Sequence, residues 1–182
     1  MKRLILSLSV ISLTLSGFQA FAQSGVYLSA KDFENAKLSY TEHHINAHIP
    51  LRYSKVKVNT PGETLLLNKS EVFGYRDEKQ RDYRFINNHA YRILDHQYFH
   101  VYSRDVEVSK GKGRIKETKY YFSTHADGEM HPLTIANLKK AFPEHKRFHE
   151  LLDMQFRHDP ELAWYDQHAQ QFKVKSIFEQ SI

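Results

Sequence analysis

Residues 83–94, YRFINNHAYRIL, contain the pattern that decides the fold. Two short runs rich in Tyr, Phe, Ile and Leu, at 83–86 and 91–94, flank the pair Asn87-Asn88. Aromatic and β-branched residues favour strands, and Asn favours turns because its short polar side chain tolerates positive φ. The segment therefore predicts two antiparallel strands joined by a tight turn.

Similar short runs lie on both sides of this segment. They occupy residues 52–58, 64–67, 70–75, 98–102 and 118–123, and turn-forming residues separate them. Short strands at this spacing predict an antiparallel β-meander of about seven strands. One face would be apolar and the other polar and rich in tyrosine. A curved sheet, a sandwich and an open barrel all remain compatible with this pattern.

Helical patterns flank the meander and predict an α+β fold. Ser29 and Asp32 form a capping box for a short N-terminal helix that extends to about residue 37. After Gly128 the apolar spacing becomes helical and predicts two to three C-terminal helices. These would cover 134–142 and 145–157, with a third beginning at Asp159-Pro160 and carrying Leu162, Tyr165, Ala169 and Phe172. We expect the helices to pack on the sheet, so that residues 23–182 form one α+β domain.

The first 22 residues are typical of a signal peptide. Lys2 and Arg3 precede an apolar run, and Ala20-Phe21-Ala22 places small residues at the −3 and −1 positions of a cleavage site. The apolar run is too short for a membrane span, which needs roughly 20 residues. We therefore expect cleavage after Ala22 and a mature protein that begins near Gln23. That protein would be exported, either to the periplasm or to the medium.

The composition excludes several classes of protein. The chain has no cysteine, which excludes disulfides, thiol catalysis and cysteine-ligated metals. Its 26 Lys and Arg residues against 21 Asp and Glu residues give a net charge of +5, to which the predicted signal peptide contributes two charges. Because the remaining excess is small and the signs are interspersed, we expect no nucleic-acid partner. No second long apolar run follows the signal, so we expect no membrane span in the mature chain.

Twelve histidines raise the question of a metal site. The densest group is His125, Asp127, Glu129 and His131, around a predicted turn at Asp127-Gly128. Two imidazoles and a carboxylate could hold zinc or another divalent ion. The spacing matches no dedicated metal motif, so a solvated polar loop is the favoured interpretation and no cofactor is expected.

A second histidine group lies on the helix predicted at 145–157. His145, His149 and Asp153 recur every four residues, and the segment that starts at His149 is one residue away from the H-E-x-x-H motif of zinc proteases. Each four-residue step turns about 40° around the helix, so Asp153 drifts toward solvent. We interpret this group as the polar flank of an amphipathic helix.

The polar sheet face supplies the candidate ligand-binding residues Tyr75, Arg76, Tyr83 and Arg84. Tyrosine and arginine recognise sugars and peptides by stacking and by forked hydrogen bonds. The same residue types also pair across strands for stability alone, and that interpretation is favoured. The sequence contains no nucleophile elbow, dinucleotide loop or phosphate-binding loop.

Several segments resemble a family of exported proteins of Bacteroidota-type bacteria that has no established activity. They are residues 25–33 (GVYLSAKDF), 72–77 (VFGYRD), 83–85 (YRF), 133–143 (LTIANLKKAFP) and 165–166 (YD). The resemblance covers most of the mature chain. It implies export and assigns no catalytic residue.

Three functional hypotheses follow. The leading one is a non-catalytic exported protein that binds another exported protein or a glycan at the cell envelope, or supports a larger assembly there. The alternative is a metal-binding protein or metal-dependent hydrolase that uses one of the His/Asp/Glu groups. A third possibility is an inhibitor or immunity-like protein that acts on another exported protein.

Overall fold

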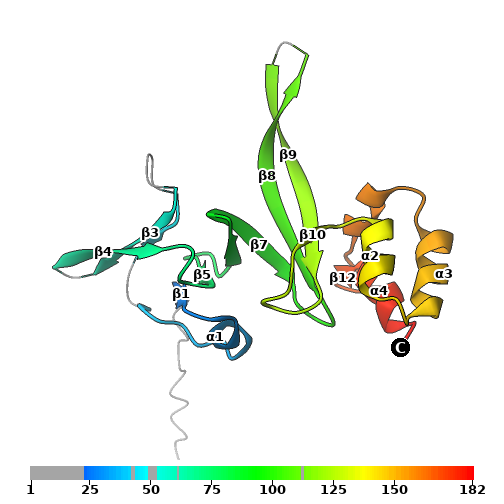
Figure 1. Cartoon of the computed structure of the whole chain (residues 1–182), viewed down its shortest axis with the longest axis horizontal. Helices are drawn as coiled ribbons and strands as arrows, with labels where there is room; N and C mark the ends of the chain where they lie inside the picture. The colour runs from blue at the N-terminus through cyan, green and yellow to red at the C-terminus, as the bar shows by residue number, and fades with distance from the viewer. Residues whose placement is uncertain (1–22, 42–43, 49–52, 61, 112) are drawn as a thin grey trace, which may run out of the picture.

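The computed structural model describes residues 23–41, 44–48, 53–60, 62–111 and 113–182. The predicted signal peptide lies outside these residues. The described part is α+β and is built around a curled, antiparallel sheet of seven strands (Figure 1). In spatial order the strands are β1 (Gly25–Tyr27), β5 (Gly74–Arg76), β6 (Asp82–Ile86), β7 (His89–Asp95), β8 (His100–Lys110), β9 (Gly113–Ser123) and β10 (His131–Pro132).

The turn between β6 and β7 confirms the prediction made from residues 83–94. Asn87 and Asn88 have φ of 49° and 64°, and Ile86 pairs with His89. Two consecutive residues with positive φ define the tight hairpin turn whose twist matches that of the flanking strands. The turn therefore sets the register of the whole hairpin, in which Tyr83 lies opposite Arg92.

Two predicted strands do not belong to the seven-stranded sheet. Strands β3 (Lys55–Thr60) and β4 (Glu63–Asn68) form a separate three-stranded sheet with β2 (His44–Asn46), and β5 pairs instead with β1. The reason is packing: Val56 and Val58 of β3 are fully buried against Val26 and Phe85. Packing the apolar face of the three-stranded sheet against the seven-stranded sheet removes more apolar surface from water than adding β3 and β4 to the larger sheet would.

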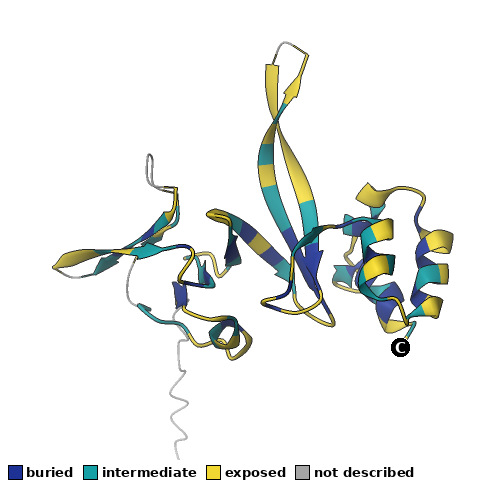
Figure 2. Ribbon diagram, in the orientation of Figure 1, coloured by how far each residue is buried: buried dark blue, intermediate teal, exposed yellow. Residues whose placement is uncertain are grey.

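Strands β8 and β9 are longer than the sequence patterns at 98–102 and 118–123 predict. They pair over eleven positions, from His100 opposite Ser123 to Lys110 opposite Gly113. Strand β7 pairs only with Val101, Tyr102 and Ser103 of β8, so the outer half of the hairpin projects from the body (Figure 1). This outer half is largely exposed (Figure 2).

The helical predictions hold for three segments. Helix α1 (Ala30–Glu34) has the expected capping box but ends before residue 37, because Ala36 adopts a φ of 51°. Helix α2 (Ile135–Ala141) is capped by Thr134, whose side chain accepts a hydrogen bond from the Asn137 N–H. Helix α3 (Lys146–Gln155) buries Phe148, Leu151 and Leu152, as the apolar stripe predicts.

The predicted helix from Asp159 to Phe172 is wrong. The segment contains a 3-10 helix (Asp159–Ala163), then a hairpin of β11 (Tyr165–Asp166) and β12 (Gln171–Phe172), and then helix α4 (Lys173–Glu179). The Asp166 side chain accepts hydrogen bonds from the N–H groups of His168 and Ala169, and Gln170 has a φ of 51°. A side chain that bonds to the following backbone competes with helix formation, so a turn replaces the helix.

Helices α2, α3 and α4 pack against the base of the β8–β9 hairpin. Phe99, Val101 and Phe122 of this base form one core cluster with buried residues of α2, α3 and α4, among them Leu138, Leu152 and Ile177. A second cluster lies under α1, and the third joins the two sheets. Among the described residues, no helix combines the length and apolar character needed to cross a membrane.

Candidate functional site

A cavity of about 1110 Å³ opens over one face of the seven-stranded sheet. Its floor comes from strands β5 to β9. Its far wall comes from β2, the two residues that follow it, and Tyr53. The core that joins the two sheets fixes this wall relative to the floor, because Val56, Val58 and Phe85 pack together behind it.

Five side chains form a continuous row across the floor. The strand registers place Tyr75 opposite Tyr83, Tyr83 opposite Arg92, Arg92 opposite Ser103, and Ser103 opposite Tyr120. Directly opposed residues of antiparallel strands point to the same face of a sheet. All five line the cavity, and we call them the floor row. Only Tyr75 and Tyr83 of this row were among the candidate ligand-binding residues predicted from the sequence.

The two tyrosines at one end of the floor row stack on each other. The ring centroids of Tyr75 and Tyr83 lie 4.6 Å apart with an interplanar angle of 7°. The Phe85 ring stacks on Tyr75 at 5.4 Å, and the Arg81 guanidinium lies over Tyr83 at 5.9 Å. Both tyrosine rings therefore have their faces occupied by protein groups. Their ring stacking is therefore satisfied within the protein, in line with the favoured interpretation of cross-strand pairing. Burial raises the pKa of the Tyr75 phenol, which keeps it a hydrogen-bond donor.

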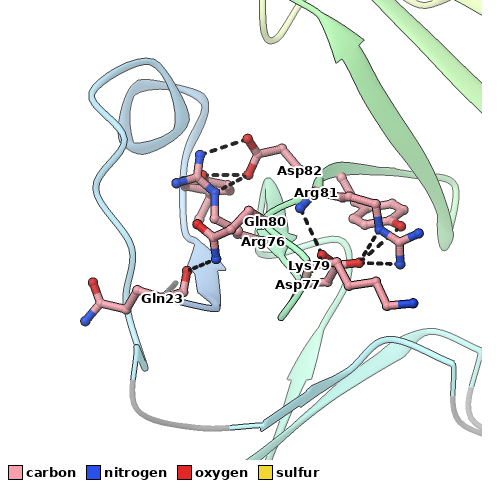
Figure 3. A network of polar contacts seen from close by, with 9 residues as sticks. Gln23, Arg76, Asp77, Lys79, Gln80, Arg81 and Asp82 are labelled. Carbon is pink, nitrogen blue, oxygen red and sulfur yellow. Dashed lines mark hydrogen bonds and ion pairs between the residues drawn. The ribbon is translucent and has the colours of Figure 1, made fainter. Parts of the chain in front are cut away.

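The two arginines in the predicted site lie on the opposite face of the sheet. Arg76 donates from Nε to Asp82 at 2.7 Å and from Nη2 to the same carboxylate at 2.9 Å (Figure 3). Arg84 is only 8% exposed and donates to the Tyr102 hydroxyl at 3.3 Å. The alternation of side chains along a strand separates Arg76 and Arg84 from Tyr75 and Tyr83. The predicted group of four is therefore split between the cavity and the interior.

The turn between β5 and β6 brings another arginine to the cavity. The Asp77 carboxylate accepts hydrogen bonds from the N–H groups of Lys79 and Arg81 and from the Arg81 side chain at 2.7 Å (Figure 3). Gln80 has a φ of 59° and donates from its side chain to the Gln23 carbonyl. Burial opposes ionisation of Asp77, but the bonds from Arg81 and Lys79 outweigh it and lower its pKa.

Positive charge exceeds negative charge around the cavity. Three Lys or Arg side chains, those of Lys69, Arg81 and Arg92, line it against the side chains of Asp77 and Asp105, and the only ion pair among these five described residues joins Arg81 to Asp77. Asp105 accepts a hydrogen bond from Thr118 at 2.7 Å. Lys69 is 6% exposed, donates to the Asn88 carbonyl and lies over the Phe85 ring.

Arg92 stands in the middle of the floor row. It is exposed, and no carboxylate within the described parts of the chain forms an ion pair with it. Burial raises the pKa of the neighbouring Tyr83 phenol, and the positive charge of Arg92 opposes only part of this effect. The guanidinium is thus placed among hydroxyl groups, with its donors available to a ligand.

The rim of the cavity carries imidazoles and one free aromatic ring. His44 of β2 contacts Glu78 at 2.6 Å, which links the small sheet to the turn between β5 and β6. Tyr53 is 66% exposed at the rim. Unlike Tyr75 and Tyr83, it has no aromatic or cationic group stacked on it among the described residues.

The first predicted metal group is divided into two pairs. His125 Nε2 lies 3.4 Å from Asp127, and His131 Nε2 lies 3.8 Å from Glu129. The corner of the turn is Ala126-Asp127 rather than Asp127-Gly128, because the Gly128 N–H donates to the His125 carbonyl and Ala126 is fully buried. Throughout the described residues, no three His, Asp or Glu side chains are arranged to hold one metal ion.

The second predicted metal group is also separated. The His149 ring contacts the Phe142 carbonyl through Nε2 at 2.9 Å, and Asp153 accepts from Lys139 at 2.6 Å. His145 precedes α3 and packs edge-on against the Phe142 ring. Each side chain therefore has its own protein partner.

No protein-family model, no curated protein and no solved structure matches this chain. The cavity and the floor row are accordingly the basis of the functional proposal.

Proposed function

We propose that this chain is an exported, non-catalytic binding protein of the cell envelope, and that its cavity binds a glycan. The single observation that carries the proposal is the floor row. Five polar or aromatic side chains from five different strands point into one concave space. The row begins at Tyr75, which packs against the core cluster that joins the two sheets, and ends at Tyr120, which packs against the cluster formed with the helices. Concave sites with a few convergent polar groups are the usual form of ligand sites.

The chemistry of the lining supports binding of a hydroxyl-rich ligand. Tyrosine hydroxyls, serine, asparagine, histidine and arginine offer both donors and acceptors around the cavity. The free ring of Tyr53 can stack on the apolar face of a sugar, since an aromatic ring provides an apolar body with a polar tip. The signal peptide predicted at 1–22 and the resemblance to exported proteins support a location at the envelope.

Blocking the floor tests the proposal. Ser103→Trp would fill the middle of the cavity, whereas Ser109→Trp places the same side chain on the same strand and the same sheet face but outside the cavity. Both variants and the wild type are titrated against a panel of neutral and acidic envelope polysaccharides by isothermal calorimetry. We expect saturable binding by the wild type and by Ser109→Trp, loss of binding in Ser103→Trp, and recovery of the glycan unchanged.

Two outcomes would contradict the proposal. Equal binding by Ser103→Trp and the wild type would place the ligand elsewhere, and shortening of the recovered glycan would show catalysis. The location is tested separately, by cell fractionation and by N-terminal sequencing, for which we expect a mature chain that begins at Gln23.

A further inference from the structure

The charge around the cavity indicates which glycans fit it. Lys69 and Arg92 line the cavity, and neither has a carboxylate partner within the described residues. Because positive charge exceeds negative charge around this concave site, its electric field raises the local concentration of negatively charged ligands. A ligand that brings negative charge would therefore complete the site.

Arg92 is the group best placed to read that charge. Its neighbours in the floor row are Tyr83 and Ser103, so a ligand that reaches the guanidinium also reaches two hydroxyl groups. The guanidinium fork matches the two oxygens of a carboxylate, and such bidentate bonds are the stronger and more directional kind. Arg81 cannot take this role, since Asp77 already occupies its fork.

The dimensions of the floor row favour a polymer. The row crosses five strands, so its length is four strand spacings of roughly 4.8 Å, or about 19 Å. At one end the Tyr75–Tyr83 stack closes the row, and at the other end Tyr120 leads to the base of the projecting hairpin. Tyr53 is 66% exposed at the rim. A chain of several sugar rings can contact the row and the rim together.

We propose that the cavity binds a polysaccharide that carries carboxylate groups, with Arg92 as the residue that recognises a carboxylate. This proposal rests on the proposed function. It adds the class of glycan and the residue that selects it. An acidic peptide has the same charge, but a peptide is normally anchored by apolar side chains in pockets, and the floor row offers hydroxyls and a guanidinium instead.

The test uses matched probes. Oligomers of galacturonate, glucuronate and mannuronate are titrated into the full mature protein, together with their methyl esters, which have the same rings without the charge, and with an oligoglutamate of equal charge. Arg92→Gln is compared with Arg114→Gln, a substitution of the same type at an exposed hairpin residue outside the cavity. Both variants should fold, since both side chains are exposed.

We expect at least one uronate oligomer to bind, and its ester to bind at least about tenfold more weakly. Arg92→Gln should lower the affinity for the uronate oligomer by a similar factor, because it removes a charge-assisted hydrogen bond. Arg114→Gln should bind like the wild type, and added salt should weaken binding. Equal affinity for acid and ester, no effect of Arg92→Gln, equal binding of oligoglutamate, or no binding of any uronate would overturn the proposal. Neutral-glycan binding that is lost in Ser103→Trp would leave the proposed function standing in each case.

Discussion

Gly74 is the position where a single methyl group should damage both the sheet and the cavity. A Cβ at residue 74 would lie 1.8 Å from the Tyr83 carbonyl oxygen and 3.1 Å from the Arg84 Cα. Both atoms belong to the backbone of the neighbouring strand, so no side chain can rotate away. An ordinary contact needs roughly 3.4 Å, so β5 and β6 would have to separate by about 1.6 Å, enough to break hydrogen bonds that otherwise lie near 2.9 Å.

The cost of this separation follows from the position of β5 in the sheet. β5 links β1 to β6, and its loss would also expose the Tyr75–Tyr83 stack. Overpacking in a well-packed region typically costs about 1–3 kcal/mol, and a clash with backbone atoms that cannot rotate away belongs at the upper end. For a chain of this size, about 3 kcal/mol corresponds to a fall in Tm of roughly 6–12 °C.

Thermal unfolding of Gly74→Ala and Gly113→Ala measures the effect. Gly113 lies in a strand as well, but a Cβ there would meet no atom within 4 Å, so this control should change stability by no more than about 0.5 kcal/mol. We also expect Gly74→Ala to weaken ligand binding, because Tyr75 and Tyr83 move with their strands. A Tm for Gly74→Ala within about 2 °C of the Gly113→Ala value would refute the reasoning.

Two further predictions concern buried ionisable groups. Burial, together with repulsion from His96, Lys175 and Arg84, lowers the pKa of His100 to about 4. Folding stability should therefore be complete above pH 6.5 and should fall by roughly 3 kcal/mol as the pH drops to 4. Urea unfolding measured from pH 7.5 to 4.5 should show this fall in the free energy of unfolding of the wild type and a smaller fall in His100→Phe. An identical dependence of the unfolding free energy on pH in the two proteins would contradict the prediction. Lys175 is fully buried, donates to the carbonyls of Gln97 and Phe99 and pairs with Asp95 at 3.2 Å. Lys175→Met should therefore lower the free energy of unfolding, measured in urea at pH 7, by about 3 kcal/mol. Adding Asp95→Asn should restore part of this loss, and an unchanged midpoint in the single variant would refute the role of Lys175.

The sequence predicts those parts of the site that depend on local structure. Once Asn87-Asn88 is identified as the turn, equal counting outward places Tyr83 opposite Arg92, so Arg92 was within reach of a sequence argument that followed the register. Ser103 and Tyr120 could not be placed by such counting, because the pairing of β7 with β8 shifts between Ile93 and Asp95. Such an irregularity depends on packing and leaves no clear mark in the pattern of residues.

The wrong helix prediction has a local cause. Leu162, Tyr165, Ala169 and Phe172 have helical spacing, yet the side chain of Asp166 fixes a turn within the segment. The candidate group of four is divided between two faces of the sheet for a simpler reason. Neighbouring residues in a strand point to opposite faces, so Arg76 and Arg84 could not share a surface with Tyr75 and Tyr83.

The most direct test of the central claim is the location of a bound ligand. Amide chemical shifts of the isotope-labelled mature protein are followed by NMR while a binding uronate oligomer is added. We predict that the shifts change along the floor row, at Tyr83, Arg92, Ser103 and Tyr120, while Ser109 on the outer hairpin stays unchanged. A second cavity of about 360 Å³ is lined by Trp164, which is 56% exposed. Shift changes confined to the residues around this second cavity would contradict the account.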